Sequence, residues 1–313
     1  MTHNLLNVLL GANGTIGSAL IPVLQKNGEP MRLVSRRPMK VDGAETFVAD
    51  ALDRERLFEA VKGSAVVYLV IGLLYDSKTW EKDWPVIMRN VIDACKSSNA
   101  KLVFFDNVYM YGRVHGYMSE TTPYKPVSRK GKVRAAIATM LQNEMKEGTI
   151  KAIIARAVDF YGPNVTDKSA AGVLVFSNMK KKKKAQWFIN ANVPRSYSYV
   201  PDAVAALYKL AKSESAYGQV WHLPAVKPPL TGKEFIELAA KYMGASDKFK
   251  VLPKFVLKLI GLFNPFLREI YEMHYQDEYP FLFDSSKFER EFWMQPTGYD
   301  EAIKTTAEWY LAH

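Results

Sequence analysis

Cysteine is almost absent from this sequence. Its 313 residues include one cysteine, Cys95, and five histidines without the spacing of metal ligands. A single thiol can form neither an internal disulfide nor a thiolate zinc cluster, and we expect no metal site. A Gly-x-Ser-x-Gly segment is also missing, which argues against a serine hydrolase.

Long apolar runs are scarce as well. The longest, Ala65–Leu74, has ten residues, whereas a membrane-spanning helix needs about 20, so a buried strand is the better interpretation. The N-terminus lacks the basic and then apolar layout of a signal peptide. Leu252–Ile270 resembles a basic amphipathic helix of the membrane surface, but Gly261 and Pro265 interrupt it. We therefore expect a cytoplasmic protein with no membrane partner.

The charge is unbalanced toward cations. Lys and Arg number 42 against 32 Asp and Glu, a net charge of +10, and Lys180–Lys184 supplies five positive charges. Such a surface attracts anions, although it also serves solubility alone. The run lies close to Trp187, a combination found in nucleic-acid sites, but no known nucleic-acid module accompanies it. We expect no nucleic-acid partner, and the role of the run stays open.

Short apolar segments alternate with amphipathic ones over the first 160 residues. The expected strands are Leu5–Leu10, Met31–Val34, Thr46–Val48, Ala65–Ile71, Lys101–Phe105 and Ile150–Ala155. The expected helices are Thr15–Lys26, Arg54–Lys62, Trp84–Ser97 and Val133–Met145. Strands that are apolar on both faces indicate a parallel sheet covered by helices. Later in the chain helices and aromatic residues dominate, with a helix at Pro201–Lys212 and one more strand at Gly218–Leu223.

Three glycines follow the first expected strand and open the first expected helix. Gly11 allows a tight turn, Gly14 lets the backbone approach a pyrophosphate, and Gly17 lets the helix pack close to the sheet. The amino end of the helix offers free N–H groups to the anion. The expected contacts are therefore these glycines with Asn13, Thr15 and Ile16.

This order predicts an α/β protein with a Rossmann-like, doubly wound parallel sheet. We expect residues 1–160 to form the dinucleotide-binding domain. Residues 161–313 should form a smaller, mostly helical C-terminal substrate lobe, with some segments returning to the sheet. Fold alone does not identify an activity.

The end of the second strand indicates which cofactor binds. An acidic residue there holds the ribose hydroxyl of NAD, whereas an arginine holds the 2′-phosphate of NADP. This sequence has Arg36 and Arg37 and no acid. We expect NADP, with NAD as the other candidate.

At this point the chain resembles the extended or atypical short-chain dehydrogenase/reductase superfamily, and within it the NAD-dependent epimerase/dehydratase family. The resemblance rests on the glycine spacing and on segments including Phe47–Ala51, Tyr111-Gly112, Phe160–Pro163, Tyr199–Asp202 and Asp284–Lys287. It implies that Asp50 contacts the adenine amino group, and we place Ala51 and Ile71 in the same cofactor site. It also implies a homodimer through the helices at 84–97 and 133–145.

The catalytic residues of that family are replaced here. Its members use a Ser or Thr and a Tyr-x-x-x-Lys pair on one helix face. Matching positions hold Asn107, Lys130 and Arg134. Arg134 can still bond a ribose, whereas a lysine moves protons near neutral pH only when its surroundings favour its neutral form. Tyr109, beside Asn107, is the alternative proton carrier.

Substrate contacts are expected around the same edge of the sheet and in the second lobe, from Tyr75, His115, Tyr161, Arg195 and Tyr197. The sequence predicts an NADP-binding oxidoreductase or an epimerase/dehydratase-like enzyme. Its small-molecule substrate would be a nucleotide sugar or a small carbonyl compound. The alternative is a non-catalytic, NADP-sensing regulatory protein that has lost proton transfer.

Overall fold

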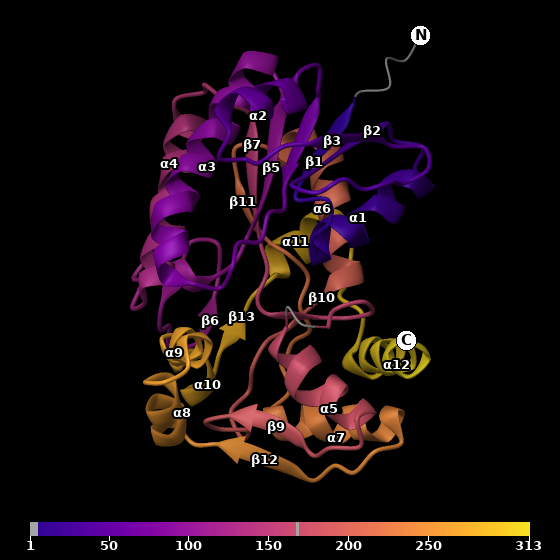
Figure 1. Cartoon of the computed structure of the whole chain (residues 1–313), viewed down its shortest axis with the longest axis vertical. Coiled ribbons are helices and arrows are strands. Elements are labelled where there is room, and N and C mark those ends of the chain that lie inside the picture. Colours follow the sequence, from indigo (N-terminus) through magenta and orange to yellow (C-terminus); the bar gives the residue numbers. More distant parts are fainter. Residues whose placement is uncertain (1–5, 167–168) are drawn as a thin grey trace. The chain divides into compact units, whose positions relative to one another are not determined.

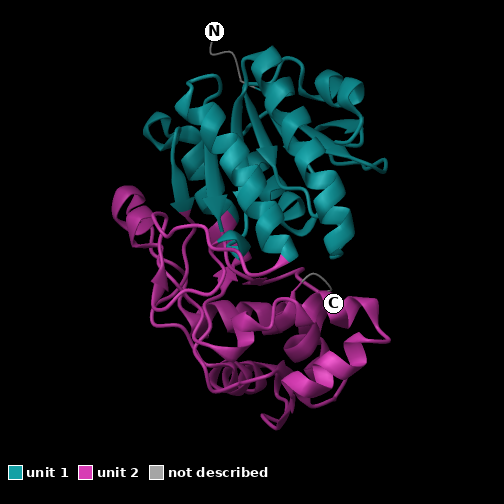
Figure 2. Cartoon of the chain, turned by 90° about the vertical axis from the view of Figure 1, so that its left-hand side faces the viewer, with its two compact units in different colours: residues 1–110, 129–156, 204–221 teal, residues 111–128, 157–203, 222–313 magenta. Residues whose placement is uncertain are grey.

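A computed structural model describes residues 6–166 and 169–313 (Figure 1). The chain divides into two compact units, coloured separately in Figure 2. Unit 1 contains residues 1–110, 129–156 and 204–221, and unit 2 contains residues 111–128, 157–203 and 222–313. Unit 2 thus takes up residues 111–128, which the expected boundary at residue 160 assigned to the first domain, and the two units are of similar length.

A seven-stranded sheet forms the centre of unit 1, in the order β11-β7-β5-β4-β1-β2-β3. The neighbours from β7 to β3 are parallel pairs. The strands are β1 Asn7–Leu10, β2 Met31–Ser35, β3 Glu45–Val48, β4 Val66–Leu69, β5 Lys101–Asp106, β7 Ala152–Arg156 and β11 Val220–His222. β1 and β7 are buried along their whole length. Strands that are buried on both faces are typical of a parallel sheet covered by helices, which is the architecture that the sequence predicted.

Helices cover both faces of this sheet, as a doubly wound fold requires. Figure 1 shows α2, α3 and α4 on one side, and α1 and α6 on the other. Their bounds are α1 Thr15–Lys26, α2 Arg54–Val61, α3 Ser77–Ser98, α4 Arg129–Lys146 and α6 Val200–Lys212, with short 3-10 turns at Tyr109–Tyr111 and Glu214–Ala216. Cys95 lies fully buried in α3, and burial raises the pKa of its thiol.

Unit 2 is built from short strand pairs and helices around an aromatic core. The pairs are β8 Phe160–Tyr161 with β10 Ser198–Tyr199, β9 Ala185–Phe188 with β12 Phe249–Leu252, and β6 Tyr117–Met118 with β13 Leu282–Phe283. The helices are the π-helix Gly172–Phe176, α5 Ser177–Lys180, α7 Gly232–Met243, α8 Lys254–Gly261, α9 Pro265–Tyr271, α10 Tyr275–Glu278, α11 Ser286–Phe292 and α12 Tyr299–Ala312. Trp187 and Phe235 lie in the core, and Gly232 leaves room for the Trp187 ring.

Candidate active site

The glycine turn after β1 is fixed by two close contacts. Gly11 has φ +95°, a backbone conformation that residues with a side chain rarely adopt. A Cβ at Gly11 would lie 2.8 Å from the Ile71 Cα. A Cβ at Gly17 would clash with the Gly11 carbonyl and lie 2.7 Å from the Ala12 Cα. These two glycines are therefore required by the packing of the turn and of α1.

The amino end of α1 begins at Gly14, and its geometry suits an anion. The Gly14 N–H donates to the Gly11 carbonyl at 2.9 Å. Among the described residues, no side chain caps this end of α1. The first-turn N–H groups, which include those of Thr15, Ile16 and Gly17, and the positive end of the helix dipole remain available to a phosphate.

A cleft of about 670 Å³, open to solvent, lies over this turn. Seven of the expected cofactor residues line it: Gly11, Asn13, Gly14, Arg36, Asp50, Ala51 and Ile71. Thr15, Ile16, Gly17, Arg37 and Arg134 were also expected, and they are not part of its lining. Sequence reasoning missed Ser35, Gly72, Leu73 and Asp83, which line it too.

Residues at the ends of β2 and β3 form one rim of the cleft. Arg36 is exposed there, and Ser35 Oγ donates to the Arg37 carbonyl at 2.5 Å. Asp50 accepts a bond from the Leu52 N–H at 3.0 Å. The rim thus presents one guanidinium, which donates hydrogen bonds, and one oriented carboxylate, which accepts them.

Lys130 is fully buried at the start of α4. Its Nζ lies 3.2 Å from Ser77 Oγ, to which it donates, and 4.5 Å from the centre of the Tyr75 ring. The structure thus brings Lys130 together with Tyr75, an expected substrate contact. With no exposed surface, Lys130 differs from an ordinary solvated lysine.

Arg134 lies one turn along α4, and its contacts differ from those expected of a ribose ligand. Its guanidinium forms a buried ion pair with Asp106, whose second oxygen lies 3.3 Å from Arg156 Nε. The same guanidinium lies 4.5 Å from the centre of the Trp84 ring. No sequence signal indicates this arrangement, because Asp106 is 28 residues away from Arg134.

Tyr109 and Asn107 follow β5, close to Trp80. The Asn107 side-chain oxygen accepts a bond from the Tyr109 N–H at 3.1 Å, which fixes the local turn. The Tyr109 ring stacks on Trp80 at 6.2 Å, and Tyr75 meets Trp80 edge-on at 5.9 Å. Trp80, which the sequence did not single out, therefore links Tyr75 to Tyr109.

The expected substrate residues of unit 2 have different surroundings. Tyr161 and Tyr197 are buried in the aromatic core, and burial raises the pKa of both hydroxyls. Arg195 is buried and pairs with Asp159 and, at 2.6 Å, with Asp277. His115 is exposed in a loop. These contacts give Arg195, Tyr161 and Tyr197 structural roles in the core.

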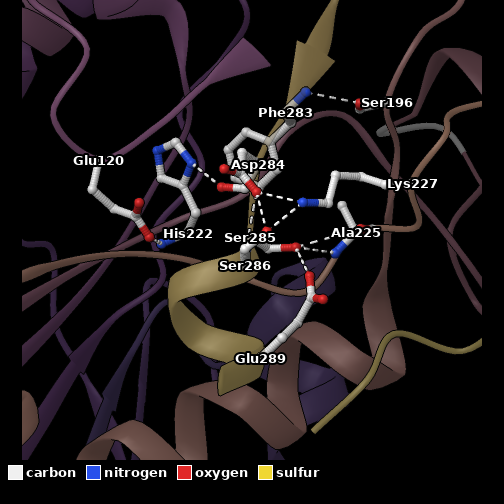
Figure 3. A network of polar contacts seen from close by, with 10 residues as sticks. All are labelled: Glu120, Ser196, His222, Ala225, Lys227, Phe283, Asp284, Ser285, Ser286 and Glu289. Atoms are coloured by element: carbon white, nitrogen blue, oxygen red, sulfur yellow. Dashed lines mark hydrogen bonds and ion pairs between the residues drawn. The ribbon is translucent and has the colours of Figure 1, made fainter. Parts of the chain in front are cut away.

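The C-terminal segment that follows β13 anchors a polar network in unit 2 (Figure 3). Buried Ser285 accepts a bond from the Ala225 N–H at 3.1 Å and donates to Glu289 Oε1 at 2.6 Å. Burial favours the neutral form of Asp284, but bonds from Lys227 and Ser286 outweigh it and hold the pKa of Asp284 at about 2.

His222 joins the same network. Its Nδ1 lies 2.9 Å from the Asp284 carbonyl, which only accepts, so Nδ1 carries the proton. Nε2 is then the acceptor for Tyr111 OH at 2.7 Å. Tyr111, part of a segment that carried the family resemblance, is therefore linked to the C-terminal segment through His222.

In the described ranges, no group of three or more His, Cys, Asp or Glu side chains is arranged to hold a metal ion. Within those same ranges, no helix is long and apolar enough to cross a membrane.

Comparison with known proteins places this geometry among related folds. A family model described as "NAD dependent epimerase/dehydratase family" matches residues 8–222. A search of curated proteins finds no significant match.

The structure is similar to several solved epimerases. UDP-glucose 4-epimerase from Thermus thermophilus, in complex with NAD, has a TM-score of 0.81 at 18% identity, with 98% of this chain and 99% of that chain covered. UDP-glucuronic acid 4-epimerase from Bacillus cereus, in complex with UDP-glucuronic acid and NAD, has a TM-score of 0.81 at 17% identity, with coverage of 98% and 99%. At such identities the likeness establishes the fold alone.

Proposed function

The chain belongs to the NAD dependent epimerase/dehydratase family, and from that premise we propose that it is an enzyme that binds NADP(H) in the cleft of unit 1. The observation that carries the proposal is the cleft itself, which joins the glycine turn, the uncapped amino end of α1 and the Arg36 guanidinium. The chain's own residues fit a dinucleotide at each of these places.

We infer a separate binding role for each part of the cleft. The N–H groups at the start of α1 hold the pyrophosphate, and Gly14 keeps side chains away from it. Arg36 holds the 2′-phosphate, while Asp50 and Ala51 contact the adenine. When bound, the nicotinamide group supplies hydride transfer.

Nucleotide sugars are the substrate class that we favour, with small carbonyl compounds as the second candidate. The family match supports epimerase or dehydratase chemistry, and the structural neighbours are named as epimerases of UDP-glucose and UDP-glucuronic acid. An oxidoreductase acting on a small carbonyl compound would use the same cofactor cleft.

We assign proton transfer to the group of side chains that follows β4 and β5 and includes the start of α4. Its members are Tyr75, Trp80, Tyr109 and Lys130. Lys130 Nζ and Tyr109 OH are the two candidate proton carriers. Asn107 positions Tyr109 through its backbone bond, and Ser77 orients the Lys130 ammonium. Arg134 positions this end of β5 and α4 through Asp106.

The cofactor assignment is tested by calorimetry with NADP+ and NAD+. Arg36→Ala should weaken NADP+ binding roughly 10- to 100-fold and leave NAD+ binding nearly unchanged, because a charge-assisted bond contributes about 1.5–3 kcal/mol. Arg37→Ala is the matched control, since Arg37 is exposed but does not line the cleft. Equal losses for both nucleotides, or a wild type that prefers NAD+, would overturn the role of Arg36.

A second variant tests the cleft independently of cofactor preference. At Gly14 a Cβ would come no closer than 3.2 Å to the protein atoms around it, so Gly14→Val is easier for the fold to accept than a change at Gly17. A folded Gly14→Val protein should lose binding of both nucleotides. Unchanged affinity would mean that the glycines serve only as a turn.

Turnover is measured by nicotinamide absorbance and by product analysis with UDP-sugars and carbonyl compounds. Lys130→Met should lower kcat by about 10²–10⁴-fold if Lys130 carries the proton, and Tyr109→Phe should do so if Tyr109 does. Nucleotide affinity should change little in either variant, because neither residue lines the cleft. Full activity in both variants would remove both candidates.

The same assay distinguishes an enzyme from the alternative, a non-catalytic regulatory protein that binds NADP. None of the comparisons supports it, but one observation favours it: Arg134, at the position of the family's ribose-binding lysine, is engaged by Asp106. A wild type that binds NADP+ tightly and turns over no substrate would support a non-catalytic sensor and oppose the enzyme.

A further inference from the structure

A group of exposed apolar side chains in unit 2 lies on α8, α9 and the loop between them. We call residues 254–271 the α8–α9 hairpin. Its outward side chains include Phe263, which is 90% exposed, and Leu262, which is 65% exposed. Phe255, Leu259 and Phe266 are more than half exposed. Isolated exposed apolar residues are ordinary, but a contiguous group of this size marks an interaction surface.

The hairpin is a formed element and not a loose segment. Leu257 and Gly261 are buried on its inner side. A Cβ at Gly261 would lie 3.2 Å from the Arg268 Cα, so the two helices approach each other closely there. Asn264 caps α9 by accepting a bond from the Leu267 N–H at 3.1 Å. The outward direction of the apolar side chains is therefore set by packing.

Cations surround the apolar cluster. Five basic residues lie between Lys248 and Arg268, with one acidic residue directly before them, the exposed Asp247, and one directly after them, the buried Glu269. Lys254 is paired with Glu278 at 2.7 Å, which leaves Lys258 and Arg268 exposed on the hairpin itself.

The basic surface continues along the neighbouring strands. Figure 1 shows β12 leading into α8, with β9 beside β12. Phe249 pairs with Ala185 in parallel register, which brings Lys248 next to the end of the exposed run Lys180–Lys184. The lysine run, whose role the sequence left open, thus adds to one cationic strip that ends at the hairpin.

This combination of chemistry favours one occupant. Phe and Leu side chains among Lys and Arg fit the boundary of an anionic bilayer, where acyl chains take the rings and headgroups take the cations. A second copy of the chain fits less well, because a two-fold interface sets a patch against itself and would bring these lysines together.

We propose that the α8–α9 hairpin is a peripheral docking surface for anionic phospholipid membranes. Helices of eight and seven residues are too short to span a bilayer and would lie in its interface. The cationic strip attracts the surface over a distance limited by salt screening, and the apolar side chains enter it.

The test is co-sedimentation of the full chain with two kinds of vesicle, one of phosphatidylcholine alone and one that also contains about 30 mol% phosphatidylglycerol. Each is measured at low and at physiological salt. The wild type should bind the anionic vesicles at least about tenfold better, and salt should weaken that binding. The double variant Leu262→Ser/Phe263→Ser should lose about tenfold or more in partition.

Controls separate docking from general stickiness. Trp293→Ser removes an aromatic side chain that is 92% exposed outside the hairpin, and it should bind vesicles as the wild type does. Lys258→Gln/Arg268→Gln should bind severalfold more weakly at low salt. Circular dichroism and thermal melting verify that each variant is folded.

Three results would overturn the proposal. The first is no partition of the wild type into either vesicle. The second is a loss of binding in Trp293→Ser as large as in the hairpin variant. The third is a concentration-dependent dimer in sedimentation velocity that Leu262→Ser/Phe263→Ser abolishes, which would assign the surface to a second copy.

Discussion

Single atoms decide the packing at Gly17. Because a Cβ there would overlap the Gly11 carbonyl, Gly17→Ala should destabilise the protein by about 2–3 kcal/mol, a typical result of overpacking. Thermal unfolding measures this loss. Gly298→Ala is the control, since a Cβ at Gly298 meets open space. Gly298 is the N-cap of α12 and alanine is a poorer cap than glycine, so we expect this variant to lose about 0.5–1 kcal/mol. Similar melting temperatures for the two variants would contradict the close contact.

Ser285 is the corresponding case for a polar residue. Ser285→Ala leaves the buried Ala225 N–H without its acceptor and Glu289 without its donor, so we expect a loss of about 1–3 kcal/mol in unfolding free energy. Urea denaturation measures it. Ser246→Ala, at an exposed serine of the same unit, should change stability by less. An unchanged unfolding free energy in Ser285→Ala would mean that water replaces the hydroxyl as the partner of the Ala225 N–H and of Glu289.

At this scale the lining of the cleft was easier to predict from the sequence than the contacts of the buried arginines. Seven of the expected cofactor residues line the cleft, because the glycine spacing and the strand ends determine which backbone atoms face it. The contacts of Arg134 and Arg195 could not be predicted. Each depends on a carboxylate distant in sequence, Asp106 for Arg134 and Asp277 for Arg195.

Among the helices, α3 and α4 are joined by one carboxylate. Glu144 on α4 accepts bonds from Arg89 at 2.7 Å and Lys96 at 2.8 Å, both on α3. Bonds from Lys96, Thr149 and Arg89 lower the pKa of Glu144 to about 2. A depressed folded-state pKa stabilises the protein above the unfolded value, near 4.5, and that contribution is lost as the pH falls toward 2.

The expected outcome is that Glu144→Gln removes this acid-sensitive contribution. After discounting for solvent screening, we expect a loss of about 1–2 kcal/mol at pH 7 and a difference from wild type that shrinks below about pH 4. Urea unfolding at a series of pH values checks it. Glu147→Gln, at an exposed residue just after α4, is the control. A loss of equal size at pH 2.5 and pH 7 would contradict the mechanism.

Element boundaries show where local sequence stops being sufficient. The bounds of α1 were predicted correctly, because apolar periodicity and the glycine turn agree. The start of α3 was placed at Trp84, whereas Asp76 caps the helix and accepts from the Thr79 N–H at 2.8 Å. Proline usually stands in the first turn of a helix, so Pro85 favours a start at Trp84, and the first two turns of α3 were missed. The two-residue strands of unit 2 carry no periodicity, so their pairing had to come from tertiary structure.

On the scale of the whole molecule, the chain passes between its two units several times. Unit 1 requires residues 204–221, which include most of α6 and the strand beside β7. A fragment of residues 1–160 would leave β7, buried along its length, as an open edge without that neighbour. It would also lose the bond from Tyr208 OH to Glu29 at 2.9 Å.

We therefore expect residues 1–160 to be aggregated or partly unfolded when expressed alone, whereas a fragment of residues 1–221 should show more native helix and cooperative melting. Size-exclusion chromatography and thermal circular dichroism compare the two. A monomeric, cooperatively melting 1–160 fragment would support the simple boundary at residue 160. The homodimer through α3 and α4 and the cytoplasmic location stay predictions.

The lone thiol of Cys95 has a consequence for following the molecule in time. Being fully buried in α3, it can meet a bulky disulfide reagent only when the α3 layer opens. The labelling rate, divided by that of the unfolded chain, then gives the opening equilibrium of this layer without any introduced probe. Adding NADP+ should slow this labelling in proportion to nucleotide occupancy, since a ligand that binds the closed form depletes the open one.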